Sequence, residues 1–484
     1  MIVFADWLRF HASMRPAEMA FATPRVRLTF AQLYETSLCI AARLHGLGLQ
    51  PGQKAAIFAV NPALQYSLLV AVNRLGLCGC ILPQWESRRS SALEAVAFDW
   101  ILTDTALEPE AKGRKVDVEL QWLAEHFPHD DLPPRKHMDS DAHCLLAISS
   151  GTVSKSKPIA FTGAQLERRI TWRGFEEQAT TPGEKTYVML SAASMLSFLT
   201  TFGTLYAGGC IYSGWPPERA AAVIAREGIN RLVSTPPLLV RQMPAFEKLG
   251  PYPHLRLVYS GGEMLFEGLS RRVTEILCPN LVTAFGTNET GQIAVGRVDR
   301  MGYQPQRVGF ILPWADAEAV DRNDKPLPPG TEGELRFRTP GMASGYLDNP
   351  DATAAQFRNG WFYPGDVGTI TKDGALIMAG RLADLITTQQ GHLSPRTIDV
   401  AASEFEGVGE AAAFGVRRGD GLDDIWLAVA GRDDLDMEKL RGFCAAKFGG
   451  QAPQHFLKLA QLPRNESGKV LRWALVDIAT GKSA

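Results

Sequence analysis

Short apolar runs alternate with amphipathic stretches through the central part of the chain. Each run has the length of a buried strand, and the segment after it repeats apolar residues every three or four positions, as a helix packed on one face does. This alternation is typical of a parallel α/β sheet. The predicted strands are 144–148, 186–190, 209–212, 231–234, 255–259 and 281–285, and the predicted helices include 164–178, 195–206 and 216–227.

The pattern changes near Ala315. Runs at 315–320, 333–339 and 369–378 read as strands, and the last contains Asp373-Gly374, a dipeptide typical of a hairpin turn. Beyond Gly380, shorter strands and helices follow at 410–416, 425–430, 437–448, 455–459 and 469–478. We therefore predict an α/β fold with a large N-terminal domain, 1–380, made of parallel α/β sheets plus a β-rich annex, and a small α+β C-terminal domain, 381–484.

The composition is that of an ordinary globular protein. Hydrophobic residues make up 45% and charged residues 21% of the 484 positions, and 50 Lys and Arg against 52 Asp and Glu predict no basic surface for nucleic acid. The seven cysteines contain no CxxC pair, which fits a reducing cytoplasm better than a zinc framework or a disulfide ladder. The N-terminus lacks a signal-peptide pattern. Residues 186–217 carry no charge, but serines and glycines interrupt them, so we expect buried core rather than a membrane span.

The segment SSGTVSKSKP, residues 149–158, gathers hydroxyls and two lysines between an apolar strand and a helix that begins near Gly163. This order predicts a strand-to-helix loop at the carboxyl edge of a sheet, where ligands commonly bind. The loop is not a Walker A motif, because Ser156 stands where that motif needs glycine. Its N–H, hydroxyl and ammonium groups can donate to a polyphosphate. On this segment alone, a polar surface loop is an equal alternative.

Six further motifs follow in order: SGGEML (260–265), AFGTNET (284–290), GELRFRTPGMASGYL (333–347), WFYPGD (361–366), GRLADLI (380–386) and PRNESGKVLR (463–472). The series resembles the adenylate-forming superfamily of acyl- and aryl-CoA ligases, carrier-protein adenylation domains and luciferases. The resemblance covers almost the whole chain. It implies an N-terminal domain that binds AMP and a mobile C-terminal domain that carries a catalytic lysine.

Enzymes of this superfamily activate a carboxylate with ATP, release pyrophosphate to leave an acyl-adenylate, and then usually pass the acyl group to a thiol. Bringing two anions together requires cations and donors that offset their repulsion. The resemblance implies that Lys469 reaches the carboxylate and the α-phosphate, and that Glu289 binds Mg²⁺, which prefers oxygen ligands. Without the motifs, Lys469 would be an ordinary solvated charge and Glu289 an exposed loop residue.

Other positions match the family's nucleotide and substrate contacts. Asp366 matches an acceptor for the ribose hydroxyls, and Arg381 a second ribose contact. The remaining nucleotide contacts that the resemblance implies are Ser149, Ser150, Gly151, Thr152, Lys157, Gly261, Gly262, Glu263, Phe285, Gly286 and Asn288. The implied substrate pocket contains Ala193, Ser194, Phe198 and Ser260, and the implied hinge is Ala383.

Several positions depart from the family pattern. The phosphate loop usually reads SGTTGxPK, but Ser154 replaces a glycine and Ser156 a proline, so we expect a reshaped loop. Ala193 stands where many relatives carry a histidine, which predicts an open cavity. No Asp or Glu occurs between Lys185 and Glu218, and a buried ammonium without a partner costs roughly a few kcal/mol. We therefore expect a carboxylic acid without an amino group, either aryl or medium aliphatic.

Two functional classes stay open. The first is a ligase that uses ATP and Mg²⁺ and loads coenzyme A or, as the runner-up, the identical phosphopantetheine end of an acyl carrier protein. The second is a catalytically silent protein of the same fold that binds nucleotide or acyl groups, which the departures at Ser154, Ala383 and Gln390 motivate. Both a monomer and a homodimer are compatible with the sequence.

A cluster of possible metal ligands lies outside these motifs. His126, His129, Asp130 and Asp131 fall within a polar, proline-bearing stretch, 126–143. Because they share no regular helical face, we favour a solvated surface loop over a metal site.

Overall fold

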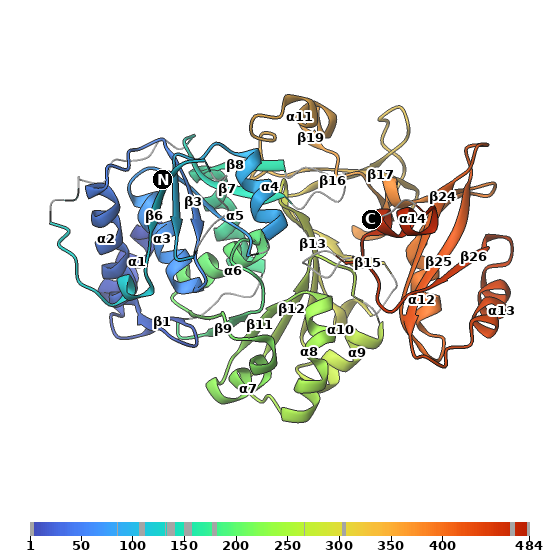
Figure 1. Ribbon diagram of the computed structural model, residues 1–484, viewed down its shortest axis with the longest axis horizontal. Coiled ribbons are helices and arrows are strands. Elements are labelled where there is room, and N and C mark those ends of the chain that lie inside the picture. Colours follow the sequence, from blue (N-terminus) through green and yellow to red (C-terminus); the bar gives the residue numbers. More distant parts are fainter. Residues whose placement is uncertain are drawn as a thin grey trace. The chain divides into compact units, whose positions relative to one another are not determined.

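The computed structural model describes residues 4–84, 86–105, 112–130, 132, 141–149, 157–176, 182–265, 267–302, 306–464 and 470–481. Internal contacts divide the chain into two compact units (Figure 1). Unit 1 comprises Met1–Tyr303, Ile311–Asp316 and Arg338–Phe362. Unit 2 comprises Gln304–Phe310, Ala317–Phe337 and Tyr363–Ala484. The domain boundary after Gly380 stays a prediction.

Unit 1 contains a six-stranded sheet in the order β6-β5-β3-β4-β7-β8. Its strands are parallel except β8, which pairs antiparallel with β7. Their bounds are β3 (Lys54–Phe58), β4 (Cys78–Ile81), β5 (Trp100–Thr103), β6 (Arg114–Asp117), β7 (His143–Ser149) and β8 (Lys157–Thr162).

A second sheet of unit 1 follows the order β14-β13-β12-β11-β9-β10-β1-β2. It is parallel from β1 to β13, with β2 and β14 antiparallel at the two sides. The bounds are β1 (Met19–Ala22), β2 (Arg27–Thr29), β9 (Lys185–Val188), β10 (Cys210–Tyr212), β11 (Arg231–Ser234), β12 (Leu257–Gly261), β13 (Leu281–Thr287) and β14 (Gly291–Arg297). The short hairpin β18 (Phe357–Arg358) and β19 (Trp361–Phe362) completes the strands of this unit. The predicted parallel α/β organisation is confirmed.

Helices pack against the faces of these sheets. They are α1 (Phe4–Met14), α2 (Phe30–Gly46), α3 (Pro62–Arg74), α4 (Glu86–Ala95), α5 (Gly163–Glu176), α6 (Met195–Tyr206), α7 (Pro217–Glu227), α8 (Pro236–Leu249), α9 (Glu267–Ile276), α10 (Val298–Met301) and α11 (Pro350–Gln356). One core packs α1, α2, α3 and α6 against both sheets, and another packs α7, α8 and α9 against β11 and β12. Each fully buried Leu, Ile or Phe contributes about 1.5–3 kcal/mol.

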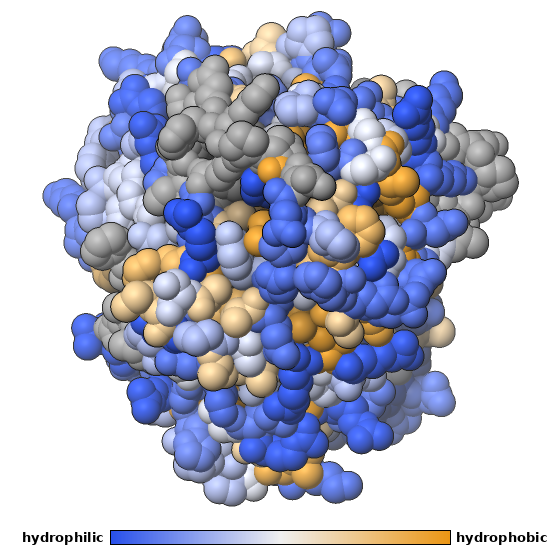
Figure 2. Space-filling view, turned by 90° about the vertical axis from the view of Figure 1, so that its left-hand side faces the viewer, coloured by the Kyte–Doolittle hydropathy of each residue, from blue (hydrophilic) through white to orange (hydrophobic). Residues whose placement is uncertain are grey.

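Local sequence explains where several helices begin and end. Thr29 caps α2 in a reciprocal arrangement with Gln32, and Asn61 caps α3 ahead of a proline. At the other end of α7, Gly228 adopts φ 63°, which favours glycine and closes the helix. Figure 2 faces the α1 and α2 side of unit 1 and shows mostly hydrophilic residues with apolar residues between them. Among the described residues, no helix combines the length and apolar character that a membrane crossing needs.

The loop at 149–158 differs from the prediction. It does not lead from a strand into a helix, because Lys157–Thr162 forms strand β8 before α5 begins at Gly163. Ile159 and Phe161 are fully buried, and β8 pairs back along β7, with Ser149 opposite Lys157. The loop therefore connects two antiparallel strands. Residues 150–156 lie outside the described part of the chain.

Unit 2 contains an antiparallel sheet in the order β17-β20-β21-β15, with β16 also paired to β17. The bounds are β15 (Arg307–Ile311), β16 (Asp316–Val320), β17 (Glu332–Arg338), β20 (Asp366–Ile370) and β21 (Ala375–Arg381). The hairpin predicted at Asp373-Gly374 is confirmed, because β20 and β21 pair antiparallel and Gly374 has φ 80°.

The chain after Gly380 supplies the rest of unit 2. Its three-stranded sheet joins β24 (Val408–Arg417), β25 (Asp423–Gly431) and β26 (His455–Lys458), and a hairpin joins β22 (Ile386–Thr388) to β23 (Gly391–Leu393). The helices are α12 (Pro395–Ser403), α13 (Met437–Phe448) and α14 (Arg472–Ala479). This part has the mixed α+β character that the sequence predicts.

Candidate active site

Glu289 lies in the tight turn that joins β13 to β14. The two strands pair up to Thr287 and Gly291, and the Thr287 hydroxyl oxygen accepts the N–H of Thr290 at 3.1 Å. Gly286 makes the close approach possible, since a Cβ there would lie 2.4 Å from the Gly291 carbonyl oxygen. The sequence AFGTNETG therefore folds as a hairpin that fixes Asn288 and Glu289 at its tip.

The Glu289 side chain is hydrogen-bonded by another residue of unit 1. Its residue is 8% exposed, and the Tyr346 hydroxyl donates to Glu289 Oε1 at 2.8 Å. The same hydroxyl lies 2.7 Å from Gln356 Oε1, which accepts a hydrogen bond from Lys157 Nζ at 2.8 Å. Lys157 Nζ also lies 5.0 Å from the centre of the Tyr346 ring. A short chain of side chains thus connects the predicted magnesium carboxylate with the predicted phosphate-loop lysine.

The backbone of the same turn is held by Arg169 on α5. Its guanidinium donates to the carbonyl oxygens of Asn288, Glu289 and Gly341 at 2.8, 2.7 and 2.7 Å. The side chain also stacks on the ring of Phe161, with 4.4 Å from Cζ to the ring centre. Burial lowers the pKa of Arg169 to about 9, so the group is charged at neutral pH.

A small cavity of about 20 Å³ lies beside this clamp. Trp172 and Trp314 stack across part of it, with ring centres 5.1 Å apart. Its lining residues are Arg169, Trp172, Leu199, Thr290, Gly291, Gln292, Trp314 and Thr339. The lining combines aromatic and apolar side chains with polar ones, and the volume suits a water molecule rather than a substrate.

The predicted adenine segment lies at the carboxyl ends of parallel strands. Ser260 and Gly261 end β12, and Gly262 has φ 85°, a conformation that favours glycine. The hydroxyl oxygens of Ser260 and Thr235 are buried, and neither has a hydrogen-bond partner within the described ranges. Strand ends of this kind are where α/β sheets commonly bind ligands. Glu263 follows, partly exposed.

The start of α6 adjoins this edge. A Cβ added to Gly261 would lie 3.4 Å from the side chain of Leu196, the second residue of α6. Ser194 is the N-terminal capping position of α6, and Ala193 precedes it, partly buried. Phe198 is 3% exposed and packs on two other aromatic rings of the core. Phe285, on β13, is also partly buried.

Two predicted ribose contacts lie together in unit 2. Asp366 begins β20 and Arg381 ends β21, and the pairing of these strands sets them opposite each other. Arg381 Nε lies 3.2 Å from Asp366 Oδ1, and the Asp366 side chain is 6% exposed against 39% for Arg381. The predicted hinge, Ala383, lies in the 3₁₀ turn Leu382–Asp384.

Some predicted site residues are not in the described part of the chain. They are Ser150, Gly151, Thr152 and Lys469. Ser149 is described only as the last residue of β7.

The sequence reasoning missed Arg169, Tyr346 and Gln356. Arg169 carried a signal, because it shares the buried face of its helix with Leu166 and Ile170 at helical spacing. A buried charge on such a face needs hydrogen-bond partners, and those of Arg169 are backbone carbonyl groups. Tyr346 lies inside the quoted motif 333–347, but nothing in that motif indicates its contact with Glu289.

Comparisons with known proteins show the family and the fold. The family described as "AMP-binding enzyme" matches residues 8–347. The chain is 25% identical to a long-chain-fatty-acid–CoA ligase of Escherichia coli O6:H1, over 96% of this chain and 92% of that protein. It is 24% identical to the fatty acid–[acyl-carrier-protein] ligase ScoC of Streptomyces coeruleorubidus, over 98% and 96%.

A solved structure gives the same result for the fold. The O-succinylbenzoate Coenzyme A Synthetase (MenE) from Bacillus subtilis, in complex with ATP and a magnesium ion, superposes with a TM-score of 0.87. The superposition covers 97% of this chain and 98% of that one, at 21% identity. The predicted fold is confirmed.

Proposed function

The chain belongs to the AMP-binding enzyme family, and we propose that it joins a carboxylic acid to the thiol of coenzyme A in two steps. ATP first converts the acid into an acyl-adenylate with release of pyrophosphate, and the acyl group then passes to the thiol. The acid has no amino group and is aryl or medium aliphatic. The relatives named as CoA ligases, aligned over nearly the whole chain, support this reaction class.

The observation that carries the proposal is the linked arrangement of Glu289, Tyr346, Gln356 and Lys157. It holds an anionic oxygen and a cationic ammonium close together at the edge of the sheets in unit 1. An adenylation site needs both, because the phosphates require a positive contact and their metal ion requires an oxygen ligand. If Glu289 only stabilised its turn, no lysine would be required in the hydrogen-bond network that includes its carboxylate.

The donor set near Glu289 fits Mg²⁺. The carboxylate lies 2.8 Å from the Tyr346 hydroxyl, which lies 2.7 Å from Gln356 Oε1, so the polar atoms linked to it are the oxygens that Mg²⁺ prefers. When bound, the ion would offset negative charge on the triphosphate. Arg169 would keep the turn, and with it the Glu289 carboxylate, in a fixed position.

The other residues take the following proposed roles. Lys157, with Ser149, Ser150, Gly151 and Thr152, contacts the phosphates, and Lys469 contacts the carboxylate and the α-phosphate in the first step. Gly261, Gly262, Glu263, Phe285, Gly286 and Asn288 border the nucleotide. Asp366 accepts from the ribose hydroxyls, and its ion pair with Arg381 orients the carboxylate.

The substrate preference follows from the segment around α6. Residues 186–217 contain no charged side chain, and Ala193, Ser194, Phe198 and Ser260 are small, hydroxylated or apolar. A substrate ammonium would find no carboxylate in that segment, whereas an apolar acyl group would be accommodated. An aryl or medium aliphatic chain therefore fits better than an amino acid.

A carrier protein is the alternative acceptor. The relative ScoC, named as a fatty acid–[acyl-carrier-protein] ligase, favours it, because that protein aligns over nearly the whole chain. The third reading is a silent nucleotide- or acyl-binding protein of the same fold. A cytoplasmic location, and a monomer or homodimer, complete the proposal.

One experiment separates these readings. The purified protein is screened for thermal stabilisation by carboxylic acids in the presence of ATP and Mg²⁺, and each hit is assayed for pyrophosphate release with and without coenzyme A or a phosphopantetheinylated carrier protein. The proposal predicts acid-dependent pyrophosphate release and a thioester with coenzyme A. A thioester formed only on the carrier protein would identify that protein, rather than coenzyme A, as the acceptor. Thermal stabilisation without pyrophosphate release would favour a catalytically silent binding protein.

A further inference from the structure

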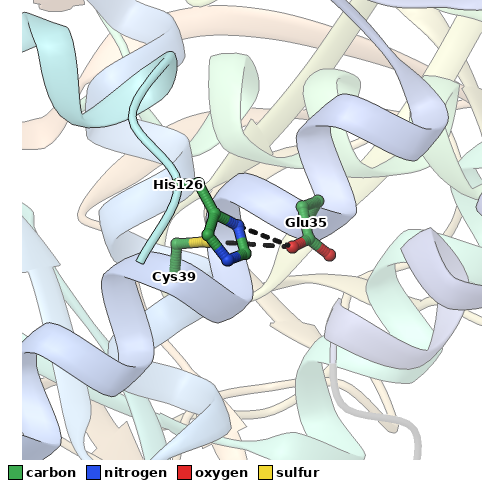
Figure 3. A group of neighbouring side chains, drawn as sticks. All are labelled: Glu35, Cys39 and His126. Carbon is green, nitrogen blue, oxygen red and sulfur yellow. Dashed lines mark hydrogen bonds and ion pairs between the residues drawn. The ribbon is translucent and has the colours of Figure 1, made fainter. Parts of the chain in front are cut away.

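A group of metal-binding side chains lies on unit 1, away from the residues discussed so far. Figure 3 shows Glu35 and Cys39 on one face of α2, with His126 reaching toward them from the segment after Leu123. One ligand atom from each of these three residues lies within 4.8 Å of the others. Beside them, His129 Nε2 forms a hydrogen bond of 2.9 Å with Glu35 Oε1. Two residues of a helix and one of a loop thus meet, although they are far apart in sequence.

The spacing of the ligand atoms is close to that of a tetrahedral metal site. With metal–ligand bonds of about 2.0–2.3 Å, neighbouring ligand atoms lie roughly 3.3–3.6 Å apart. Glu35 Oε1 is 3.7 Å from His126 Nδ1 and 3.9 Å from Cys39 Sγ. Without an ion, the Cys39 thiol donates its hydrogen to Glu35 Oε1. Shifts of a few tenths of an ångström would bring the atoms to tetrahedral spacing.

The helix supplies its two ligands from adjacent turns. Glu35 and Cys39 are four residues apart on α2, so their side chains project from the same face. Cys39 is 2% exposed, whereas the Glu35 side chain is 48% exposed. The group is therefore buried on its sulfur side and reachable from solvent on its carboxylate side, which gives an ion an entry path.

Neighbouring contacts hold the loop in place without an ion. The Thr36 hydroxyl donates to the Leu123 carbonyl at 3.1 Å, and Arg43 pairs with Glu125 at 2.8 Å. The Phe127 N–H lies 3.4 Å from Cys39 Sγ. His126 and His129 are thus presented to α2 by a preformed loop. Such a second layer of contacts is what orients the ligands of a metal site.

We propose that Glu35, Cys39 and His126 form a site for a divalent cation of the zinc class, with a fourth position open to solvent and His129 orienting the Glu35 carboxylate. Sulfur, imidazole nitrogen and carboxylate oxygen suit Zn²⁺, and are too soft a set for Mg²⁺. On binding, the Cys39 thiol loses its proton to solvent, and the thiolate and carboxylate together balance the two charges of the ion. The ion joins α2 to the segment 126–129.

The test is metal binding by the full, tag-free chain after treatment with a chelator and its removal. Zn²⁺ affinity is measured by competition with an indicator, and Co²⁺ is used as the spectroscopic probe, with no nucleotide, acid or Mg²⁺ present. The proposal predicts one equivalent of ion and a thiolate-to-Co²⁺ charge-transfer band. Because no adenylation chemistry is involved, failure here leaves the proposed function untouched.

Variants assign the ligands. His126 is exposed, so His126→Ala leaves the fold intact, and we expect at least tenfold weaker Zn²⁺ binding; Cys39→Ser should abolish the charge-transfer band. His45→Ala, an exposed histidine on the same helix, is the matched control and should bind like the parent. The proposal is overturned if the parent binds no stoichiometric ion, if the Co²⁺ complex lacks the thiolate band, or if His126→Ala retains full affinity.

Discussion

Replacing Arg169 by Met removes the clamp on the Glu289 turn while keeping a side chain of similar length in the core. The change deletes three hydrogen bonds from a charged donor to the carbonyl oxygens of Asn288, Glu289 and Gly341. It leaves those carbonyls buried beside a thioether that cannot donate to them.

The expected loss can be worked from these contacts. Hydrogen bonds to a charged group contribute about 1.5–3 kcal/mol each, so three contribute roughly 4.5–9 kcal/mol. Burying the guanidinium costs several kcal/mol in the opposite direction, and removing one partner of such an arrangement typically costs about 3–5 kcal/mol. We expect Arg169→Met to lose about 3–5 kcal/mol of unfolding free energy, and Arg169→Lys, which keeps the charge, to lose less.

Arg168→Met is the matched control. Arg168 is the adjacent residue on α5, exposed, with one hydrogen bond to the Pro340 carbonyl at 2.9 Å, and its loss should change stability by less than about 0.5 kcal/mol. Arg169→Met, Arg169→Lys and Arg168→Met are each measured by denaturant unfolding and by the Mg²⁺ dependence of acid-dependent pyrophosphate release. Arg169→Lys should need at least tenfold more Mg²⁺ for half-maximal rate. If the Arg169 and Arg168 variants match in both measurements, Arg169 does not position the turn.

Three further changes test other parts of the site. Tyr346→Phe removes a hydrogen bond to Glu289 that is worth about 1.5 kcal/mol, so the unfolding free energy should fall by about that amount. Because the Glu289 carboxylate loses its orientation, kcat/KM for pyrophosphate release should fall roughly tenfold, and an unchanged kcat/KM would contradict the role given to the hydroxyl. Gly286→Ala would place a Cβ 2.4 Å from a backbone oxygen, so it should lower the unfolding free energy in a denaturant titration by about 1–3 kcal/mol. Gly268→Ala is the control and should not lower it, because the space around Gly268 is open. Equal effects of the two changes would argue against the close approach of the strands. Lys469→Ala should abolish pyrophosphate release from free acid yet still allow thioester formation from a pre-made acyl-adenylate, and loss of both steps would refute the division of labour.

The sequence predicts elements wherever periodicity is local. The uncharged stretch 186–217 is apolar at both ends and helical between, and it folds as β9, α6 and β10. The Asp373-Gly374 turn is equally local, because one dipeptide sets the geometry of the hairpin. The strand at 157–162 was missed, since it begins with Lys-Pro and becomes a strand by pairing with β7.

The sequence does not predict the contacts between segments that lie far apart along the chain. Arg169 reads as one more charge on a helix, and its acceptors lie 119 to 172 residues further along the chain. In the same way, His126 and His129 suggested only a solvated loop until α2 supplied Glu35 and Cys39 beside them. Family motifs indicated which residues carry chemistry, whereas the side chains that hold them emerged only from the fold.

The central claim is that a carboxyl group and the α-phosphorus of ATP react in one site. Acid-dependent exchange of labelled pyrophosphate into ATP measures this directly, because exchange requires reversible formation of the mixed anhydride. The account predicts exchange that needs Mg²⁺ and an aryl or medium aliphatic acid, and that Glu289→Gln strongly reduces. Absence of exchange and of any trapped acyl-adenylate across a broad panel of such acids, with folded protein, would contradict it.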